Sequence, residues 1–241
     1  MTALDDLAPV PFHDAAAPQR ARMLSRLADT ELAVALVAEP SGDQVELRIF
    51  PLEGGPVALA CDTEDRLAGF FGGPVAYAAM PGRVLAGLLK AEGAGLLVNP
   101  GLPSEMLLDA AMLDWLTGAL SATPEATDAR LRLTAPASDT VEALAQPLAE
   151  RLGDMRGLIA GAALAGAGKG HVVLVAGADP AHQPAIAKAL AEALAFLPEQ
   201  PGGVDVSFTD AALPQQVLRF DLSPPEQPAA PPRPKGPPIL R

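Results

Sequence analysis

The amino-acid sequence predicts an α/β (α+β) protein with an N-terminal mixed α/β sheet domain, a ferredoxin-like βαββαβ domain and a proline-rich tail. Short runs that are apolar, or that alternate apolar and polar residues, are typical of strands. They alternate along the chain with segments whose apolar residues recur every three to four positions, as in helices. A polar stretch that contains proline, residues 123–129, predicts a linker. From residue 223 onward eight of nineteen residues are proline, which disfavours helix and inner strand. The predicted units are residues 1–122, 130–222 and 223–241.

Strand and helix signals alternate through the N-terminal unit. Pro18 suits the first turn of a helix, which then presents Met23, Leu24 and Leu27 on one face. Apolar or alternating runs between turn residues predict five strands, at 31–38, 45–50, 57–61, 75–80 and 95–98, the first two joined as a hairpin. We expect these strands to form one mixed sheet covered by helices.

Three further helices in this unit are predicted from caps and apolar spacing. Asp62 follows a strand as an N-cap, and Asp65 adds negative charge to the first turn of the helix that it begins. Asp109 is expected to cap the last helix in the same way. The apolar faces of the second and third helices are Val84, Leu85, Leu88 and Leu89, ending near Gly93, and Met112, Leu113, Leu116 and Leu120, with Trp115 beside them.

The C-terminal unit has the predicted order strand, helix, hairpin, helix, strand, which is that of a ferredoxin-like split βαβ unit. Asp139 with Glu142 resembles a capping box at the start of the first helix, and Pro147 should kink or interrupt that helix. The elements are a strand at 130–134, a helix with Val141, Leu144, Leu148 and Leu152, a hairpin of 157–164 and 171–176, a helix begun by Asp179 and Pro180, and a strand at 204–208.

Charge and composition limit the kinds of partner and the compartment. With 29 acidic and 17 basic side chains, the net charge of −12 repels phosphate backbones and argues against nucleic acid. The single cysteine, Cys61, excludes an internal disulfide, and the N-terminus lacks the positive and apolar regions of a secretory signal. No uninterrupted apolar run reaches the roughly 20 residues of a membrane helix. We therefore expect a cytoplasmic protein with no membrane partner.

Three segments of the N-terminal unit resemble a bacterial family, SseB, named for enhanced serine sensitivity. Residues 23–32 (Met-Leu-Ser-Arg-Leu-Ala-Asp-Thr-Glu-Leu) are similar to its opening helix and strand, residues 60–67 (Ala-Cys-Asp-Thr-Glu-Asp-Arg-Leu) to a strand with an acidic cap, and residues 97–101 (Leu-Val-Asn-Pro-Gly) to its most recognisable turn. The C-terminal unit resembles the family's C-terminal domain in its order of elements. The resemblance implies a fold and a link to serine tolerance or amino-acid metabolism, and it implies no catalytic residue.

The turn after strand 95–98 supplies the candidate binding residues. Asn99 could present its amide to a ligand, or it could only hydrogen-bond its own turn. Leu102 and Met106 form either an exposed apolar surface for a partner or a cover over the core. Ligands of α/β folds bind at strand ends, and this turn follows a strand. The candidate binding residues are Asn99, Pro100, Gly101, Leu102, Met106 and Trp115.

The sequence shows no catalytic or cofactor motif. The stretch 161–170 fails as a phosphate loop, because Ala163 stands where the first glycine belongs and Gly170 stands where Ser or Thr must follow Lys169. The three histidines are scattered, and no serine lies in a nucleophile elbow. Acidic residues that follow Cys61 oppose a thiolate. We therefore predict no catalytic residue, no cofactor and no metal ion.

These observations predict a non-catalytic binding or regulatory protein, whose partner is another protein or a small metabolite. One alternative is an enzyme with a site assembled from distant residues, which would show a deep pocket where a carboxylate or histidine meets backbone donors. The other is a type III secretion-associated protein, since the same family name is also attached to a translocon protein. That role would require export or membrane association.

Overall fold

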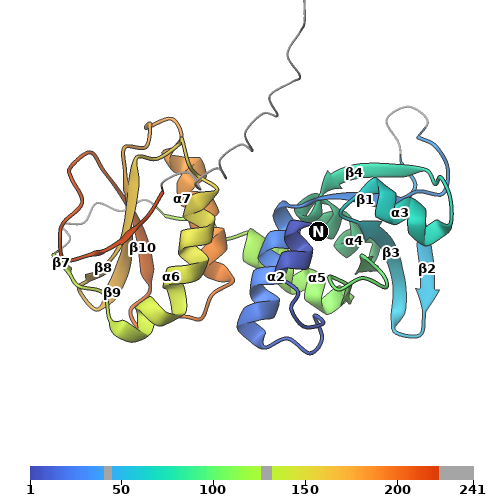
Figure 1. Ribbon diagram of the computed structural model, residues 1–241, viewed down its shortest axis with the longest axis horizontal. Coiled ribbons are helices and arrows are strands. Elements are labelled where there is room, and N and C mark those ends of the chain that lie inside the picture. Colours follow the sequence, from blue (N-terminus) through green and yellow to red (C-terminus); the bar gives the residue numbers. More distant parts are fainter. Residues whose placement is uncertain (41–44, 126–131, 223–241) are drawn as a thin grey trace, which may run out of the picture.

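The computed structural model describes residues 1–40, 45–125 and 132–222 of the chain. It shows two α/β halves, each built on one sheet, so the predicted α/β class is confirmed (Figure 1). The predicted linker falls largely on residues outside the described ranges, as does the whole proline-rich tail, and the domain boundaries stay predictions. Within the described ranges, no helix has the length and apolar character needed to cross a lipid bilayer.

The N-terminal half contains a six-stranded mixed sheet. Its strands are β1 (Glu31–Ala35), β2 (Ile49–Leu52), β3 (Gly55–Cys61), β4 (Tyr77–Pro81), β5 (Gly95–Val98) and β6 (Met106–Leu108). The order is β4-β1-β3-β5-β6, with β2 also paired to β3. β3 and β5 run parallel, with Ala60 opposite Val98, and the other pairs are antiparallel. The carboxyl ends of β3 and β5 therefore lie side by side.

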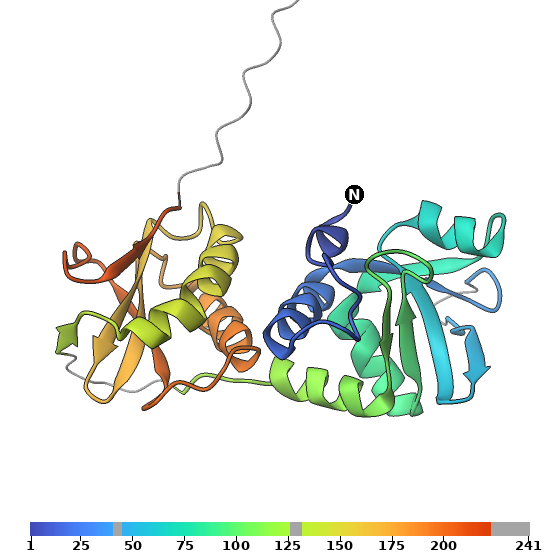
Figure 2. The ribbon, with the colours of Figure 1, turned by 60° about the horizontal axis from the view of Figure 1, so that its bottom comes forward.

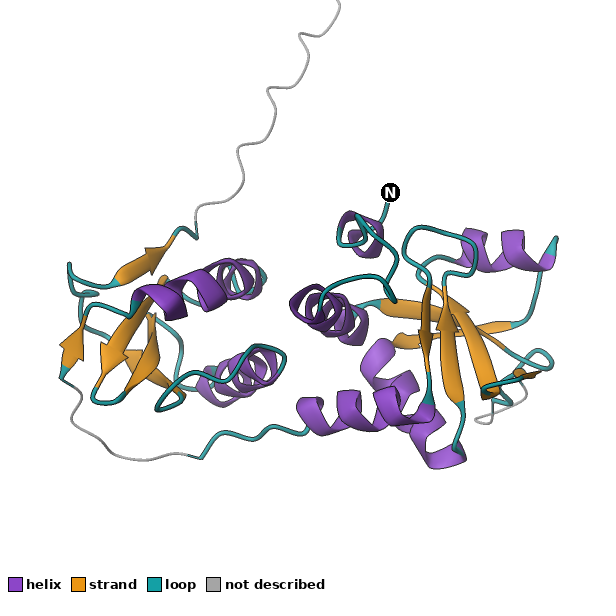
Figure 3. Ribbon diagram, turned by 90° about the horizontal axis from the view of Figure 1, so that it is seen from below, coloured by secondary structure: helices purple, strands orange, loops and turns teal. Residues whose placement is uncertain are grey.

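Helices cover the two faces of this sheet unequally (Figure 3). Side chains of α1 (Ala3–Asp6), α2 (Ala17–Asp29), α4 (Gly82–Glu92) and α5 (Ala110–Leu120) form the larger core with one face. The other face packs against α3 (Glu64–Phe71), through Leu67 and Phe71. Burial of each large apolar side chain in such a core contributes about 1.5–3 kcal/mol, so the first face supplies most of the stability.

Several boundary residues in this half act as the sequence predicts. Gly93 ends α4 in the left-handed conformation, with φ 64°. The Asp109 carboxylate accepts a hydrogen bond from the Met112 N–H at 2.8 Å and so caps α5. The buried face of α4 differs from the predicted one in two residues, since Val84 and Leu88 are 48% and 45% exposed. The buried residues of this helix are Gly82, Leu85, Ala86 and Leu89.

Two predictions for this half were wrong. The N-cap of α3 is Thr63, whose hydroxyl accepts from the Arg66 N–H at 3.3 Å, since the Asp62 carboxylate is bound instead by the Arg66 guanidinium. The expected hairpin of 31–38 and 45–50 shrinks to one bridge between Leu36 and Leu47, because β2 pairs with β3.

The C-terminal half contains a five-stranded sheet with two helices on one face (Figure 2). Its elements are β7 (Leu133–Thr134), α6 (Ser138–Gly153), β8 (Gly161–Ala167), β9 (Gly170–Ala176), α7 (Gln183–Ala195), β10 (Val204–Thr209) and β11 (Leu218–Phe220). The helices lie on the side of the sheet that faces the N-terminal half. β8 and β9 form the predicted hairpin around Gly168 and Lys169, which leaves no phosphate loop at that position.

The ferredoxin-like arrangement is not confirmed, although the elements follow one another as predicted. A split βαβ unit places a strand between its two parallel strands. Here β10 pairs directly with β9 in parallel, and both β7 and β11 pair with β8. The helix α6 is also corrected: it begins without a side-chain cap and continues through Pro147 as sixteen helical residues.

Candidate functional site

The Asn99 side chain joins the carboxyl ends of the two parallel strands β3 and β5. Asn99 is fully buried and has the left-handed φ of 47°, which is uncommon outside glycine. Its Oδ1 accepts from the Asp62 N–H at 3.0 Å, and its Nδ2 donates to the Ser104 Oγ at 2.9 Å. Its own N–H donates to the Ala60 carbonyl at 3.0 Å. The amide therefore fixes the turn from within.

Around Asn99 lies a group of polar side chains, the strand-end cluster, made of Thr2, Asp5, Asp62, Arg66, Asn99 and Ser104. The Arg66 Nη1 donates to the Asp62 Oδ1 at 2.8 Å and to the Asp5 Oδ1 at 3.2 Å, and its Nη2 donates to the Asp5 Oδ2. The Ser104 hydroxyl donates to the Asp5 Oδ1 at 2.7 Å. α1 thus brings an N-terminal carboxylate onto the ends of β3 and β5.

The charges of the strand-end cluster stabilise one another in a nearly dry position. The side chains of Asp5 and Asp62 are 7% and 2% exposed, and that of Arg66 is 21% exposed. The hydrogen bond from Arg66 holds the pKa of Asp5 far below its usual range, and the same bond raises the pKa of Arg66. Both groups therefore stay ionised at neutral pH, and neither is placed to exchange protons with a substrate.

Cys61 lies at the end of β3 and is 1% exposed. Burial raises the pKa of its thiol to about 11. We expect about 0.1% thiolate at pH 8, so that a water-soluble maleimide labels the native chain at least about 100-fold more slowly than the chain in urea. Labelling at equal rates in the two states would contradict the burial and the raised pKa.

The remaining residues of the candidate turn are divided between surface and core. Gly101 is exposed, with φ 75°, and its N–H donates to the Glu105 carboxylate at 2.6 Å. Pro100 and Leu102 are half-buried. Met106 is 1% exposed and belongs to the core, so it is part of the cover over that core and not of an exposed surface.

The neighbour of Met106, Leu107, points to the other face of the sheet and is 50% exposed. It lies opposite Leu97 in the register of β5 and β6. Leu52 on β2 is 45% exposed, and Leu107 and Leu52 both line a hollow of about 240 Å³, the apolar groove. The groove is lined by Leu52, Gly54, Gly55, Pro56, Val57, Gly93, Gly95, Leu107, Asp109 and Ala110. Sequence reasoning missed it, because β6 was not recognised as a strand.

Trp115 lies away from the Asn99 turn, at the interface between the two halves. Its ring packs edge-on against the Phe196 ring, with centroids 5.5 Å apart and planes at 81°. Phe196 is 6% exposed and packs into the core of the N-terminal half. The structure therefore brings Asn99, Pro100, Gly101, Leu102 and Met106 together in one loop and strand, but not Trp115.

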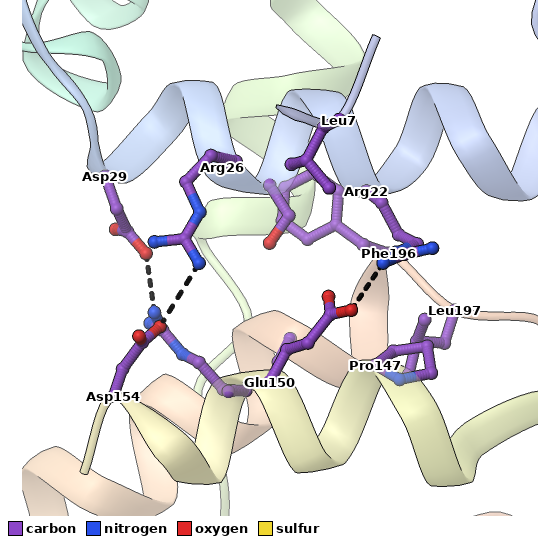
Figure 4. Close-up of a pocket in the computed structure, with 12 residues that line it drawn as sticks. Leu7, Arg22, Arg26, Asp29, Pro147, Glu150, Asp154, Phe196 and Leu197 are labelled. Atoms are coloured by element: carbon purple, nitrogen blue, oxygen red, sulfur yellow. Dashed lines mark hydrogen bonds and ion pairs between the residues drawn. The ribbon is translucent and has the colours of Figure 1, made fainter. Parts of the chain in front are cut away.

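Three ion pairs join α2 to the C-terminal part of α6 and its cap at the same interface (Figure 4). Arg22 pairs with Glu150, Arg26 with Asp154 at 3.7 Å, and Asp29 with Arg151 at 2.6 Å. They line a cavity of about 50 Å³, which has room for a few water molecules. The buried Nε atoms of Arg22 and Arg151 have no partner among the described residues, which is consistent with a hydrated cavity.

Asp29 joins three elements, because Arg83 on α4 and Arg151 on α6 both bind its carboxylate. Burial acts to raise its pKa, but the two arginines hold that pKa below the usual value. We expect Asp29→Ala to loosen the halves, so that emission from the single tryptophan shifts further to the red at about 1 M salt than in the unmodified chain. Asp14→Ala, which removes an exposed carboxylate, is the control, and equal shifts would contradict the role of Asp29.

Within the described ranges no three potential ligand side chains lie close enough together to hold a metal ion. The fold and the site define a two-part α/β protein with a buried polar cluster at the ends of parallel strands. Residues 12–115 match the family model of the SseB protein N-terminal domain, and this part of the chain belongs to that family. The resemblance predicted from the sequence is thereby confirmed for the N-terminal half. No curated protein and no solved structure matches the chain.

Proposed function

We propose that this chain is a non-catalytic binding or regulatory protein of the cytoplasm, and that it binds a partner protein through the apolar groove. The observation that carries the proposal is the unequal cover of the first sheet, whose second face packs against the eight-residue helix α3. Leu52 and Leu107 are left about half exposed beside a hollow. Apolar patches of this kind are typical of protein–protein contacts, where a buried anchor side chain supplies most of the affinity.

The charges beside the apolar groove indicate the chemistry of the partner. Asp109 lines the groove, and the exposed Glu53 and Glu92 directly adjoin lining residues in the sequence. Among the residues that the structure describes, no basic side chain lines it, and the whole chain carries a net charge of −12. A complementary partner presents an apolar side chain flanked by basic residues, because opposite charges speed association and exclude wrong partners.

Two observations support binding of a protein over turnover or a metabolite. The titratable groups at the strand ends have protonation states that suit neither a nucleophile nor a base, since the pKa of Cys61 is raised and that of Asp5 is lowered. The cavity between the halves, at about 50 Å³, and the apolar groove, at about 240 Å³, both lie below the roughly 300–1,000 Å³ of metabolite pockets. The link to serine tolerance would then reflect a partner that acts in amino-acid metabolism.

The test places a photo-crosslinking amino acid at position 107 in the living cell, identifies the protein attached to it, and measures the affinity of that purified protein. We expect Leu107→Asp to weaken binding at least about tenfold, because it puts a charge into the apolar contact. Leu88→Asp is the matched control, since Leu88 is 45% exposed on α4 and lies outside the groove.

Thermal unfolding of both variants must first show that the fold is retained. Equal affinities of the unmodified chain and Leu107→Asp would overturn the groove as the binding surface. If the purified chain chemically converts the protein that is crosslinked to it, the non-catalytic assignment is overturned instead.

A further inference from the structure

The Asp5 carboxylate is held at the strand ends in the manner of a bound ligand. The Arg66 guanidinium faces both of its oxygens, with Nη1 3.2 Å from Oδ1 and Nη2 bonded to Oδ2. The Ser104 hydroxyl donates to Oδ1 at 2.7 Å, and the Thr2 N–H donates to Oδ2 at 3.0 Å. A planar guanidinium that meets both oxygens, with a hydroxyl donor beside it, is the arrangement by which proteins recognise carboxylates.

Two of the groups that hold this carboxylate, on Arg66 and Ser104, are also positioned by other residues. Asp62 fixes the Arg66 Nη1 at 2.8 and 3.1 Å, and the Asn99 amide fixes the Ser104 hydroxyl at 2.9 Å. Asn99 is itself anchored by backbone groups of β3 and its neighbour Asp62. All four residues lie within the matched SseB domain, whereas Asp5 precedes it. The receiving groups and the bound carboxylate therefore come from different parts of the chain.

We propose that Arg66 and Ser104 form a binding site for an external carboxylate, and that Asp5 is an internal competitor that occupies the site. Their place outside the carboxyl ends of two parallel strands is the place where α/β folds bind ligands. The competitor is carried by the four-residue helix α1 and is tethered by the buried side chains of Leu4 and Phe12. This site lies at the opposite ends of β3 and β5 from the apolar groove, and it does not depend on the proposed function.

The test empties the site by Asp5→Ala and adds acetate as the carboxylate. We expect Asp5→Ala to lower the Tm, and millimolar acetate to raise that Tm by roughly 4 °C, in a saturable manner that sodium chloride at equal ionic strength does not reproduce. Asp6→Ala is the matched control on the same helix, because the exposed Asp6 makes no ion pair among the described residues. Acetate should leave its Tm unchanged.

Two further measurements separate the site from a general salt effect and identify the source of the carboxylate. In the double variant Asp5→Ala with Ser104→Ala, the rise in Tm on adding acetate should be at least about fivefold smaller, since a hydrogen-bond donor is lost.

Trialanine and its C-terminal amide, compared on Asp5→Ala, distinguish a peptide carboxyl terminus from a small free acid. Stabilisation by acetate alone assigns the small acid, and additional stabilisation by trialanine but not its amide assigns the peptide terminus.

Competition is tested on the unmodified chain by amide hydrogen exchange. A carboxylate that takes the place of Asp5 should speed exchange of the Asp5 and Asp6 amides, whose N–H groups are bonded within the N-terminal turn, and leave exchange in β5 unchanged. Absence of saturable rescue in Asp5→Ala would overturn the binding site. Rescue in Asp5→Ala without faster exchange in the unmodified chain at saturating acetate would overturn the competitor role of Asp5.

Discussion

Arg66→Met is expected to lower the free energy of unfolding by about 4 kcal/mol at pH 7, because it leaves two buried carboxylates without their counter-charge. The side chains of Asp5 and Asp62 are 7% and 2% exposed, so water cannot replace the lost guanidinium. Methionine keeps much of the length of the arginine stem, which limits the loss of packing. Urea unfolding followed by circular dichroism measures the difference.

The pH dependence of this loss separates charge from packing. In the unmodified chain the pKa of Asp5 lies below the ordinary value of 3.8, so its ion pair stabilises the fold above that pH and the stabilisation fades as the pH falls further. In Arg66→Met the Asp5 carboxylate loses the guanidinium that lowers its pKa, so acid protonates it more readily and relieves its repulsion with Asp62. The deficit should therefore be largest at neutral pH and shrink as the pH falls toward and below about 4.

Arg66→Lys is the matched variant, since it keeps the charge and loses the planar contact with both Asp5 oxygens. We expect it to lose about 2 kcal/mol, roughly half of the loss in Arg66→Met. A deficit in Arg66→Met that stays constant from pH 7 to acid would show that packing, and not charge, is what Arg66 contributes.

The strand-end cluster shows what sequence alone could not supply. The Asn99 turn is recognisable because asparagine, proline and glycine each have a local conformational preference. Arg66 and Asp5 lie 61 residues apart, and Ser104 and Asp5 lie 99 apart, so no local pattern connects them. The one signal available was the spacing of Asp62 and Arg66, which are four residues apart and can pair on one helical turn.

The fold follows the same division between local and distant interactions. Capping by Asp109 and termination at Gly93 depend on neighbouring residues, and both were predicted from the sequence. The strand order of the C-terminal sheet depends on which distant strands pair, and there the ferredoxin-like prediction did not hold. Leu107 was missed for a related reason: without a recognised strand at β6, the alternation that buries Met106 and exposes Leu107 could not be assigned.

Two glycines in α4 are expected to respond to alanine with opposite signs. A Cβ at Gly82 would lie 2.1 Å from the Leu27 carbonyl oxygen and 3.0 Å from its carbonyl carbon. Both are backbone atoms of α2, so no rotamer change relieves the clash, and we expect Gly82→Ala to lower the free energy of unfolding by about 3 kcal/mol. Gly87 is exposed, and no described atom beyond its own turn of helix would lie within 4 Å of such a Cβ, so Gly87→Ala should stabilise by about 0.5–1 kcal/mol.

Both substitutions add one methyl group to the same helix, and only the one at Gly82 meets backbone of α2, so the difference between them reports mainly the contact between α2 and α4. Urea midpoints of the two variants, measured beside the unmodified chain, should differ by about 4 kcal/mol when converted with a common slope. A Gly82→Ala chain as stable as Gly87→Ala would mean that α2 and α4 do not approach so closely. Asp29 ends α2 and is bound by Arg83 of α4, so its position would then differ as well. The ion pairs that Asp29 makes between the halves would differ with it.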